Sequence, residues 1–399
     1  MKILVCAHEA PVEPFDGFRG PVAALVERLR AAHEVRVLAV RAPDQNVAAA
    51  SGMTLVERPV GGAFARAASA VRAMTNGRPR GVDALAGSLD APLRDAIESF
   101  FPDVVHVTSG RLAGLARAVR DVPNVLAVFD ALHLNVAAAA SESDLLRAAL
   151  LRGEVKRWER FEAAAWPLFD AVTVVSDEDA RALSALAPAM PLHVIGAGVD
   201  AARFTSDLGI PRVPGRVVFH GVMDYAPNVA AALHLAREVF PIIRSADPSA
   251  TLVIAGRDPA PAVAALGRLP GVSVTGTVAD MRSVLSSGSV YVCAMRSGSG
   301  VKNKILEAAS NGLACIATPL ATRGLGAGLA DAILVGEDPE TLARLALRVL
   351  GDEALAIRLG TAGRDAVVAE HDWPAVVRAY ETLYRGVIDR RRVATRERA

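Results

Sequence analysis

Short β-branched runs alternate with longer segments rich in Ala, Leu and Arg along almost the whole chain, and this alternation constrains the fold most strongly. A short apolar run followed by a helical pattern predicts a βα unit, and successive βα units build a parallel sheet. The expected strands span residues 2–7, 35–40, 104–107, 125–129 and 171–175, then 216–220, 251–255, 272–275, 290–294, 314–318 and 333–335. The expected helices include residues 21–32, 143–164, 228–243 and 342–350. The pattern predicts an α/β protein.

The length of the chain, 399 residues, favours two domains, because single hydrophobic cores stop growing at about 250–300 residues. The segment Gly196–Gly215 interrupts the alternation with glycines, prolines and mixed polarity, which is typical of a linker. We therefore predict domains at residues 1–196 and 197–372, followed by a C-terminal helix at 373–399 that packs back on the first domain. In parallel sheets ligands bind outside the carboxyl ends of the strands, so a cleft between the two domains is the expected site.

The charge balance and the apolar segments exclude several classes of protein. Lys plus Arg (44) nearly equals Asp plus Glu (43), so no overall field indicates a nucleic-acid partner. The apolar run near the N-terminus is too short for a signal peptide, and no uncharged stretch approaches the ~18 residues of a membrane span. The three cysteines lie in apolar runs and are expected to be reduced core residues. These features predict a cytoplasmic protein.

The C-terminal segment is rich in arginine, at positions 385, 390, 391, 392, 396 and 398. Such a basic tail predicts a peripheral contact with an anionic membrane surface. The alternative is a solvated, frayed terminus.

A glycine-rich segment, Arg296–Glu307, lies between a strand-like run and a helix-like run that ends near Gly312. Gly298 and Gly300 allow a backbone to approach a ligand closely, and the free N–H groups of a helix start attract anions. The segment lacks the Gly-Lys-Ser/Thr ending of nucleotide-hydrolysing loops. It therefore predicts a phosphate-binding loop of another kind, with an ordinary turn as the alternative.

Charged side chains in the same segment extend this interpretation. Lys302, Lys304 and Arg296 can neutralise a diphosphate, and Glu307, about two turns into the expected helix, can accept both hydroxyls of a ribose. The alternative makes Lys304 and Glu307 a surface i,i+3 pair of a few tenths of a kcal/mol.

Five stretches of the second half carry a resemblance to a known family. They are residues 298–308 (GSGVKNKILEA), 219–228 (FHGVMDYAPN), 253–259 (VIAGRDP), 274–280 (VTGTVAD) and 198–204 (GVDAARF). The chain resembles the retaining glycosyltransferases of family 4, also called group 1, and within them a branch that includes sugar transferases of bacterial surface polysaccharides. The resemblance covers most of the chain and implies a GT-B architecture, in which two Rossmann-like domains face a cleft.

The resemblance implies roles for several residues. Glu307 matches the family's contact to the donor ribose, and the donor site would include Gly221, Asn228, Gly298, Ser299 and Gly300. Two departures stand out. Ser299 occupies a position that is usually acidic, and Val222 and Asn228 occupy the positions of the family's Arg/Lys pair. The charge for a diphosphate would then come from Arg296, Lys302 and Lys304.

The first half offers candidates of its own. Asp130 falls where many relatives carry a histidine that touches the donor sugar, and His133 lies three residues further on. These two are either catalytic residues, or a helix cap and a surface histidine. A loop with Gly17, Arg19 and Gly20 resembles the family's glycine loop over the diphosphate or the acceptor, with a simple turn as the alternative.

The predicted function is transfer of a sugar from a nucleoside-diphosphate sugar to a hydroxyl or amine acceptor, with retention, in surface glycan or natural-product biosynthesis. The acceptor (a small molecule, a lipid-linked species or a glycan) stays open. The alternatives are a nucleotide-sugar epimerase of the same fold and an inactive partner subunit. No cofactor and no metal are expected, because the acidic residues at 177–179 fit a helix start capped by Ser176 better than a metal site.

Overall fold

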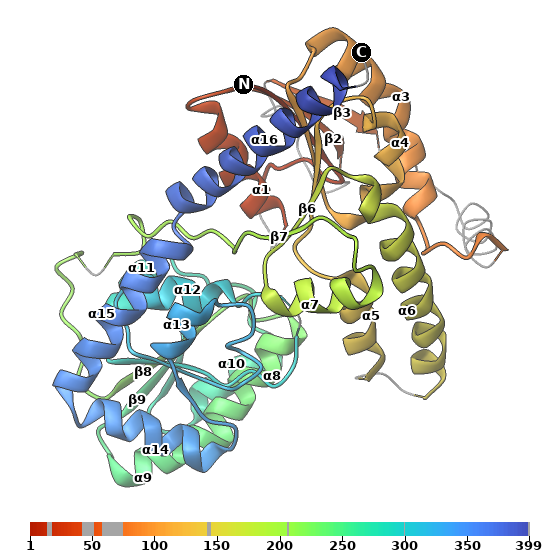
Figure 1. The fold of residues 1–399 in the computed structure, drawn as a ribbon. Coiled ribbons are helices and arrows are strands. Elements are labelled where there is room, and N and C mark those ends of the chain that lie inside the picture. The colour runs from red at the N-terminus through yellow and green to blue at the C-terminus, as the bar shows by residue number, and fades with distance from the viewer. Residues whose placement is uncertain are drawn as a thin grey trace. The chain divides into compact units, whose positions relative to one another are not determined.

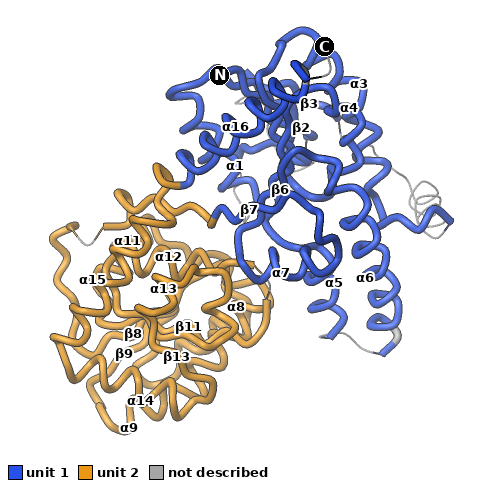
Figure 2. Tube along the Cα trace, in the orientation of Figure 1, with its two compact units in different colours: residues 1–195, 376–399 blue, residues 196–375 orange. Residues whose placement is uncertain are grey.

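The computed structural model describes residues 1–13, 18–41, 52–57, 75–141, 145–205, 207–298 and 300–397. The chain divides into two compact units, residues 1–195 with 376–399 and residues 196–375 (Figure 2). Each unit contains a parallel sheet flanked by helices (Figure 1), so the predicted α/β class with two Rossmann-like sheets is confirmed.

The described part of the first unit contains a seven-stranded sheet in the order β3-β2-β1-β4-β5-β6-β7. Its strands are β1 (Lys2–Ala7), β2 (Glu34–Arg41), β3 (Met53–Glu57), β4 (Val104–Thr108), β5 (Asn124–Ala127), β6 (Ala171–Val174) and β7 (Leu192–Val194). Its helices are α1 (Arg19–Arg30), α3 (Val82–Phe100), η2 (Gly110–Leu115), α4 (Ala116–Val119), α5 (Leu132–Ser141), α6 (Leu145–Ala165), η3 (Trp166–Leu168), α7 (Asp177–Leu186) and most of α16 (Trp373–Arg396).

The described part of the second unit contains a six-stranded sheet in the order β10-β9-β8-β11-β12-β13. Its strands are β8 (Arg216–His220), β9 (Thr251–Ala255), β10 (Val272–Val274), β11 (Val290–Cys293), β12 (Cys315–Ala317) and β13 (Leu334–Val335). Its helices are α8 (Ala226–His234), the π-helix η4 (Leu235–Val239), α9 (Phe240–Ala246), α10 (Pro261–Ala264), η5 (Ala265–Arg268), α11 (Met281–Ser286), α12 (Asn303–Ser310), α13 (Ala327–Asp331), α14 (Pro339–Leu350) and α15 (Glu353–Glu370).

The strand order of the second unit reverses direction between β8 and β11, which pair directly, Val217 with Val290 and Val218 with Tyr291. At such a switch point the connections from the two strands leave toward opposite sides, which opens a crevice at the carboxyl edge. In the first unit the corresponding reversal lies between β1 and β4. The topology therefore directs attention to the segments that follow β8 and β11.

Every described strand except β3 and β7 was predicted to within two residues at each end. The strands at residues 2–7, 216–220 and 251–255 have their predicted bounds, because each is a continuous apolar run that ends up buried. The prediction missed β3 and β7, whose side chains are only partly buried, since both lie at edges of the sheet. The helix predicted at 228–243 is in fact three segments, with the π-helix in the middle.

The cysteines are core residues, as predicted, and so is His106. Cys6, Cys293 and Cys315 are buried and free, and burial raises the pKa of the Cys6 thiol to about 12. His106 lies in β4, its side chain is buried, and burial lowers its pKa to about 4, so the ring is neutral at pH 7. Its Nδ1 lies 2.7 Å from the hydroxyl of Tyr384 on α16.

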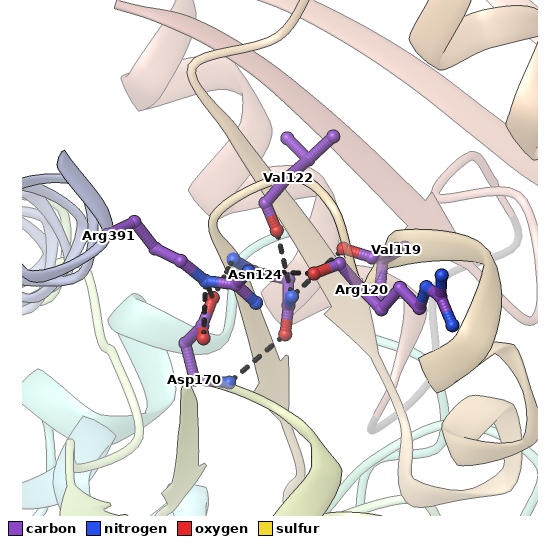
Figure 3. Close-up of polar contacts among 6 residues, drawn as sticks. All are labelled: Val119, Arg120, Val122, Asn124, Asp170 and Arg391. Atoms are coloured by element: carbon purple, nitrogen blue, oxygen red, sulfur yellow. Dashed lines mark hydrogen bonds and ion pairs between the residues drawn. The ribbon is translucent and has the colours of Figure 1, made fainter. Parts of the chain in front are cut away.

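Helix α16 is also held to the first unit by Arg391 (Figure 3). Its Nε donates to both oxygens of Asp170 at 2.8 and 2.9 Å, and its Nη1 donates to the carbonyl of Arg120 at 2.7 Å. Asp170 in turn accepts the backbone N–H of the fully buried Asn124 at 3.0 Å. The arginine-rich segment is therefore an ordered helix as far as Arg396, and the frayed-terminus alternative is wrong over this range.

The Tyr384–His106 contact gives a stability prediction. Tyr384→Phe should lower the free energy of unfolding by about 1–2 kcal/mol, because it leaves the buried Nδ1 of His106 without its partner. Urea denaturation monitored by fluorescence and circular dichroism measures this change. Tyr380→Phe is the matched control: its hydroxyl makes only a 3.4 Å contact with Thr173, so a smaller loss is expected. Equal losses of unfolding free energy in the two variants would show that the hydrogen bond between Tyr384 and His106 adds no stability of its own.

Candidate functional site

The glycine loop after β11 runs through Lys302 before the helix begins. Gly298 and Gly300 adopt φ of 98° and 70°, and α12 starts only at Asn303. Both values lie in the left-handed region that favours glycine, so the two residues extend the loop. Glu307 is therefore the fifth residue of α12, little more than one turn from its start, and the prediction of about two turns was wrong. Ser299 lies outside the described residues.

The two lysines of the segment are held by protein acceptors on different elements. Lys302 is buried, and its ammonium donates to the carbonyls of Gly298 at 3.2 Å and Gly300 at 2.5 Å. Lys304 is partly buried; its ammonium donates to Oδ1 of Asn228, lies 3.4 Å from Sδ of Met295, and sits over the ring of Phe219 at 5.4 Å. Burial lowers the pKa of Lys304. The alternative that Lys304 forms a surface pair with Glu307 is therefore wrong, because the ammonium of Lys304 is bound to Asn228.

The loop after β8 supplies the acceptor for Lys304. Asn228 is buried in the first turn of α8, and its amide nitrogen donates to the carbonyl of Val222 at 2.9 Å. A Cβ on Gly221 would lie 2.8 Å from that same nitrogen, so a side chain there would displace Asn228. The structure thus brings together three residues of the predicted donor site, Gly221, Asn228 and Lys304.

Glu307 pairs with a residue that the sequence interpretation missed. Its Oε2 lies 2.7 Å from Nε2 of His220, the last residue of β8. The side chain of His220 is 5% exposed and that of Glu307 is 28% exposed. Glu307 is therefore partly exposed to solvent at the switch point, while its Oε2 is held by His220. A histidine at the end of a strand, within an otherwise apolar run, was the only sequence signal for this partner.

Arg296 is placed differently from the lysines. It is 61% exposed, and its guanidinium lies 3.9 Å from Oε1 of Glu238 in the π-helix η4. Oε1 of Glu238 also lies 3.1 Å from Nδ1 of His234, and this contact lowers the pKa of Glu238. The structure shows Arg296 paired with the π-helix, and its predicted diphosphate contact stays a prediction.

In the first unit, His133 is a buried residue, so the surface-histidine alternative is wrong. Its Nδ1 lies 2.5 Å from Oε2 of Glu162 on α6, and its backbone N–H donates to Oε1 of the same carboxylate at 3.1 Å. Glu162 is fully buried, and burial raises its pKa. Asp130 accepts a hydrogen bond from Asn135 at 3.1 Å. Glu162 was also missed by the sequence interpretation.

The start of α5 is capped by residues distant in the sequence. The N–H of Ala131 donates to Asp179 at 2.9 Å, and the N–H of His133 donates to Glu162. Asp179 also completes the predicted cap of α7, since its backbone N–H donates to Ser176 at 3.1 Å. These hydrogen bonds from distant residues stabilise the start of α5. The carboxylate of Asp179 is committed to hydrogen bonds, as the capping interpretation expected.

The loop predicted to cover the diphosphate or the acceptor is described only in part. Gly17 lies outside the described residues, and Arg19 and Gly20 form the start of α1. Arg19 is buried, and its guanidinium bonds Oε2 of Glu9, with Nε and Nη2 both at 3.0 Å. Among the described residues no group of three or more His, Cys, Asp or Glu side chains could hold a metal ion. In the same part of the chain, no helix is long and apolar enough to cross a membrane.

Comparisons with known proteins agree with this architecture. Residues 22–203 match the model of Glycosyltransferase Family 4, and residues 214–352 match that of Glycosyl transferases group 1. The comparison with curated proteins gives no match.

Solved structures share the whole fold at low identity. Sucrose-phosphate synthase from Thermosynechococcus elongatus is 18% identical, with a TM-score of 0.69 over 97% of this chain and 99% of that chain. A glycosyltransferase from Rickettsia africae is 12% identical, with a TM-score of 0.66 over 97% and 98%. The HepE protein of Anabaena, in complex with UDP and glucose, is 12% identical, with a TM-score of 0.63 over 95% and 98%.

At these identities the solved structures establish the fold. The two family models together span most of the chain and establish the family. The chain belongs to the group 1, family 4 type of glycosyltransferases and is an enzyme of that class.

Proposed function

We propose that this glycosyltransferase takes its sugar from a nucleoside-diphosphate donor, which binds on the second unit at the carboxyl edge between β8 and β11. The observation that carries the proposal is the grouping at this switch point of a held but accessible carboxylate, Glu307, with two lysine ammonium groups, Lys302 at the end of the glycine loop and Lys304 in the first turn of α12. The carboxylate suits the ribose hydroxyls and the lysines suit the diphosphate. The Anabaena neighbour, in complex with UDP and glucose, supports a donor of this class.

The two lysines reach the diphosphate in this proposal by exchanging partners. Lys302 leaves the loop carbonyls and Lys304 leaves Asn228, and each gains an anionic oxygen, which is a stronger acceptor than a carbonyl or an amide. Because these cations are already desolvated in the protein, their attraction for an anion is larger than at an exposed site. No metal is needed in this scheme.

The reaction we propose proceeds with retention. The bond between the anomeric carbon and the diphosphate oxygen breaks, and the acceptor oxygen bonds to the same face of the sugar. The acceptor proton passes to the departing phosphate oxygen, which carries the leaving charge. The protein's contribution is to position the reactants and to stabilise negative charge on the diphosphate. Asp130 or His133 contacts the sugar in this scheme, and the first unit supplies the acceptor side.

Incubation with a panel of nucleotide sugars, with and without candidate acceptors, tests this proposal. Release of nucleotide that depends on the acceptor supports transfer, and EDTA is expected to leave the rate unchanged. Conversion of the sugar without an acceptor would instead indicate an epimerase, and tight binding without turnover would indicate a partner subunit. The anomeric configuration of the product, read by NMR coupling constants, decides between retention and inversion.

Glu307→Gln is expected to weaken binding of the donor about tenfold or more, because an ionised hydrogen-bond acceptor for the ribose becomes neutral. Calorimetric titration with UDP, ADP and GDP measures the change. Glu353→Gln, the same substitution at an exposed position of α15, is the control and should leave the affinity unchanged. Unchanged affinity in Glu307→Gln would remove this carboxylate from the donor site.

A further inference from the structure

His220 is a polar residue that is buried at the end of the apolar strand β8. It is the last residue of β8, its side chain is 5% exposed, and β8 lies directly beside β11 at the switch point. The neighbouring residues of the strand are apolar and fully buried, so a polar ring here costs solvation unless it has a partner. That partner is Oε2 of Glu307, 2.7 Å from Nε2.

The second ring nitrogen determines which way the hydrogen bond runs. Nδ1 of His220 is buried and has no hydrogen-bond partner among the described residues, and the ring packs edge-on against Tyr291 with centroids 5.5 Å apart. An unpaired lone pair at Nδ1 is less costly than an unpaired N–H, since the N–H would be a desolvated donor. The proton therefore belongs on Nε2, which donates to Glu307.

The consequence for Glu307 is a fixed rotamer. A glutamate side chain that is 28% exposed would otherwise sample several orientations, and ordering it on ligand binding would cost conformational entropy. With Oε2 held by His220, the other oxygen, Oε1, accepts no hydrogen bond from the described residues and is left for a ligand. The carboxylate is thus oriented before the ligand arrives.

We propose that His220 is a positioning residue that orients Glu307 toward the ribose hydroxyls and thereby makes the enzyme prefer ribonucleotide over 2′-deoxyribonucleotide donors. This inference rests on the proposed donor function of Glu307. It assigns His220 no contact with the reacting atoms. Because His220 acts on recognition of the donor, substituting it should change the affinity and the KM for the donor and leave kcat nearly unchanged.

The test compares binding of UDP with 2′-deoxy-UDP, and of ADP and GDP with their 2′-deoxy forms, by calorimetry. His220→Leu removes the donor with a side chain of similar bulk, and His220→Gln keeps an N–H donor. We expect His220→Leu to weaken ribonucleotide binding about five- to tenfold and 2′-deoxynucleotide binding by a smaller factor, because the deoxy form offers Glu307 only its 3′-hydroxyl, so the preference is reduced. His220→Gln should recover at least part of it. A purely structural role would weaken both forms equally.

The outcomes separate this inference from the proposed function. If Glu307→Gln reduces the ribose preference and His220→Leu does not, the role of His220 is overturned and the donor site stands. If Glu307→Gln leaves the preference intact, the ribose contact itself is wrong. Thermal unfolding of each variant reports whether it folds. If His220→Leu does not fold, a full ribose preference in His220→Ala, which has no side-chain donor, would overturn the inference.

Discussion

Lys304→Met should lower kcat/KM for the donor about 100- to 1000-fold, because a cation in a desolvated site strongly stabilises the negative charge that develops on the diphosphate. Methionine retains the unbranched apolar part of the lysine side chain and removes only the ammonium group, which lies over Phe219 and beside Met295. The loss should fall mainly on kcat, since the charge on the leaving group is greatest in the transition state.

The pH profile gives a second readout for Lys304. Burial lowers its pKa, so in the free enzyme the ammonium loses its proton at a lower pH than an exposed lysine does. Only the charged form attracts the diphosphate, so donor affinity should fall as the pH rises through this lowered pKa. The methionine variant has no ammonium to titrate, so its donor affinity should not show this fall. Steady-state kinetics between pH 6 and pH 10 would check it. Lys156→Met, at an exposed position of α6, is the control for loss of one positive charge. A loss below about fivefold in Lys304→Met would make this lysine a structural residue.

The sequence predicted the strands of the core and the glycine loop because both depend on local patterns. Buried central strands such as β1, β8 and β9 are continuous apolar runs, and a parallel sheet covered on both faces requires that composition. The loop after β11 was recognisable from Gly298 and Gly300, since few residues tolerate their positive φ.

What the sequence could not reveal depends on contacts between distant residues. His220 and Glu307 are 87 positions apart, and His133 and Glu162 are 29 apart on different helices. A glutamate within a helical pattern is normally a solvated residue, so the full burial of Glu162 could not be anticipated. The hydrogen-bond acceptors at the start of α5 could not be anticipated for the same reason, because they come from α6 and α7.

The buried pair of His133 and Glu162 gives the second large prediction. Glu162→Ala should destabilise the first unit by about 3–5 kcal/mol, because it removes the acceptor for a backbone N–H at the start of α5 and for the ring of His133, and leaves a cavity. Denaturant unfolding measures the loss. Glu159→Gln, three residues earlier on α6, is the matched control, and a change within about 0.5 kcal/mol is expected there.

Glu162→Gln separates the structural role of this pair from its chemical role. The glutamine Oε1 can still accept the backbone N–H of His133, but its NH₂ group then faces Nδ1 of the ring, which must become an acceptor. The ring proton moves to Nε2, so Nε2 changes from a hydrogen-bond acceptor to a donor. If His133 contacts the donor sugar through Nε2, activity should fall about 10- to 100-fold while thermal stability changes by only a few degrees. The ¹⁵N shifts of labelled histidine report the tautomer directly. A reversed tautomer with full activity would exclude His133 from the chemistry, and an unreversed one would show that the carboxylate does not fix the ring.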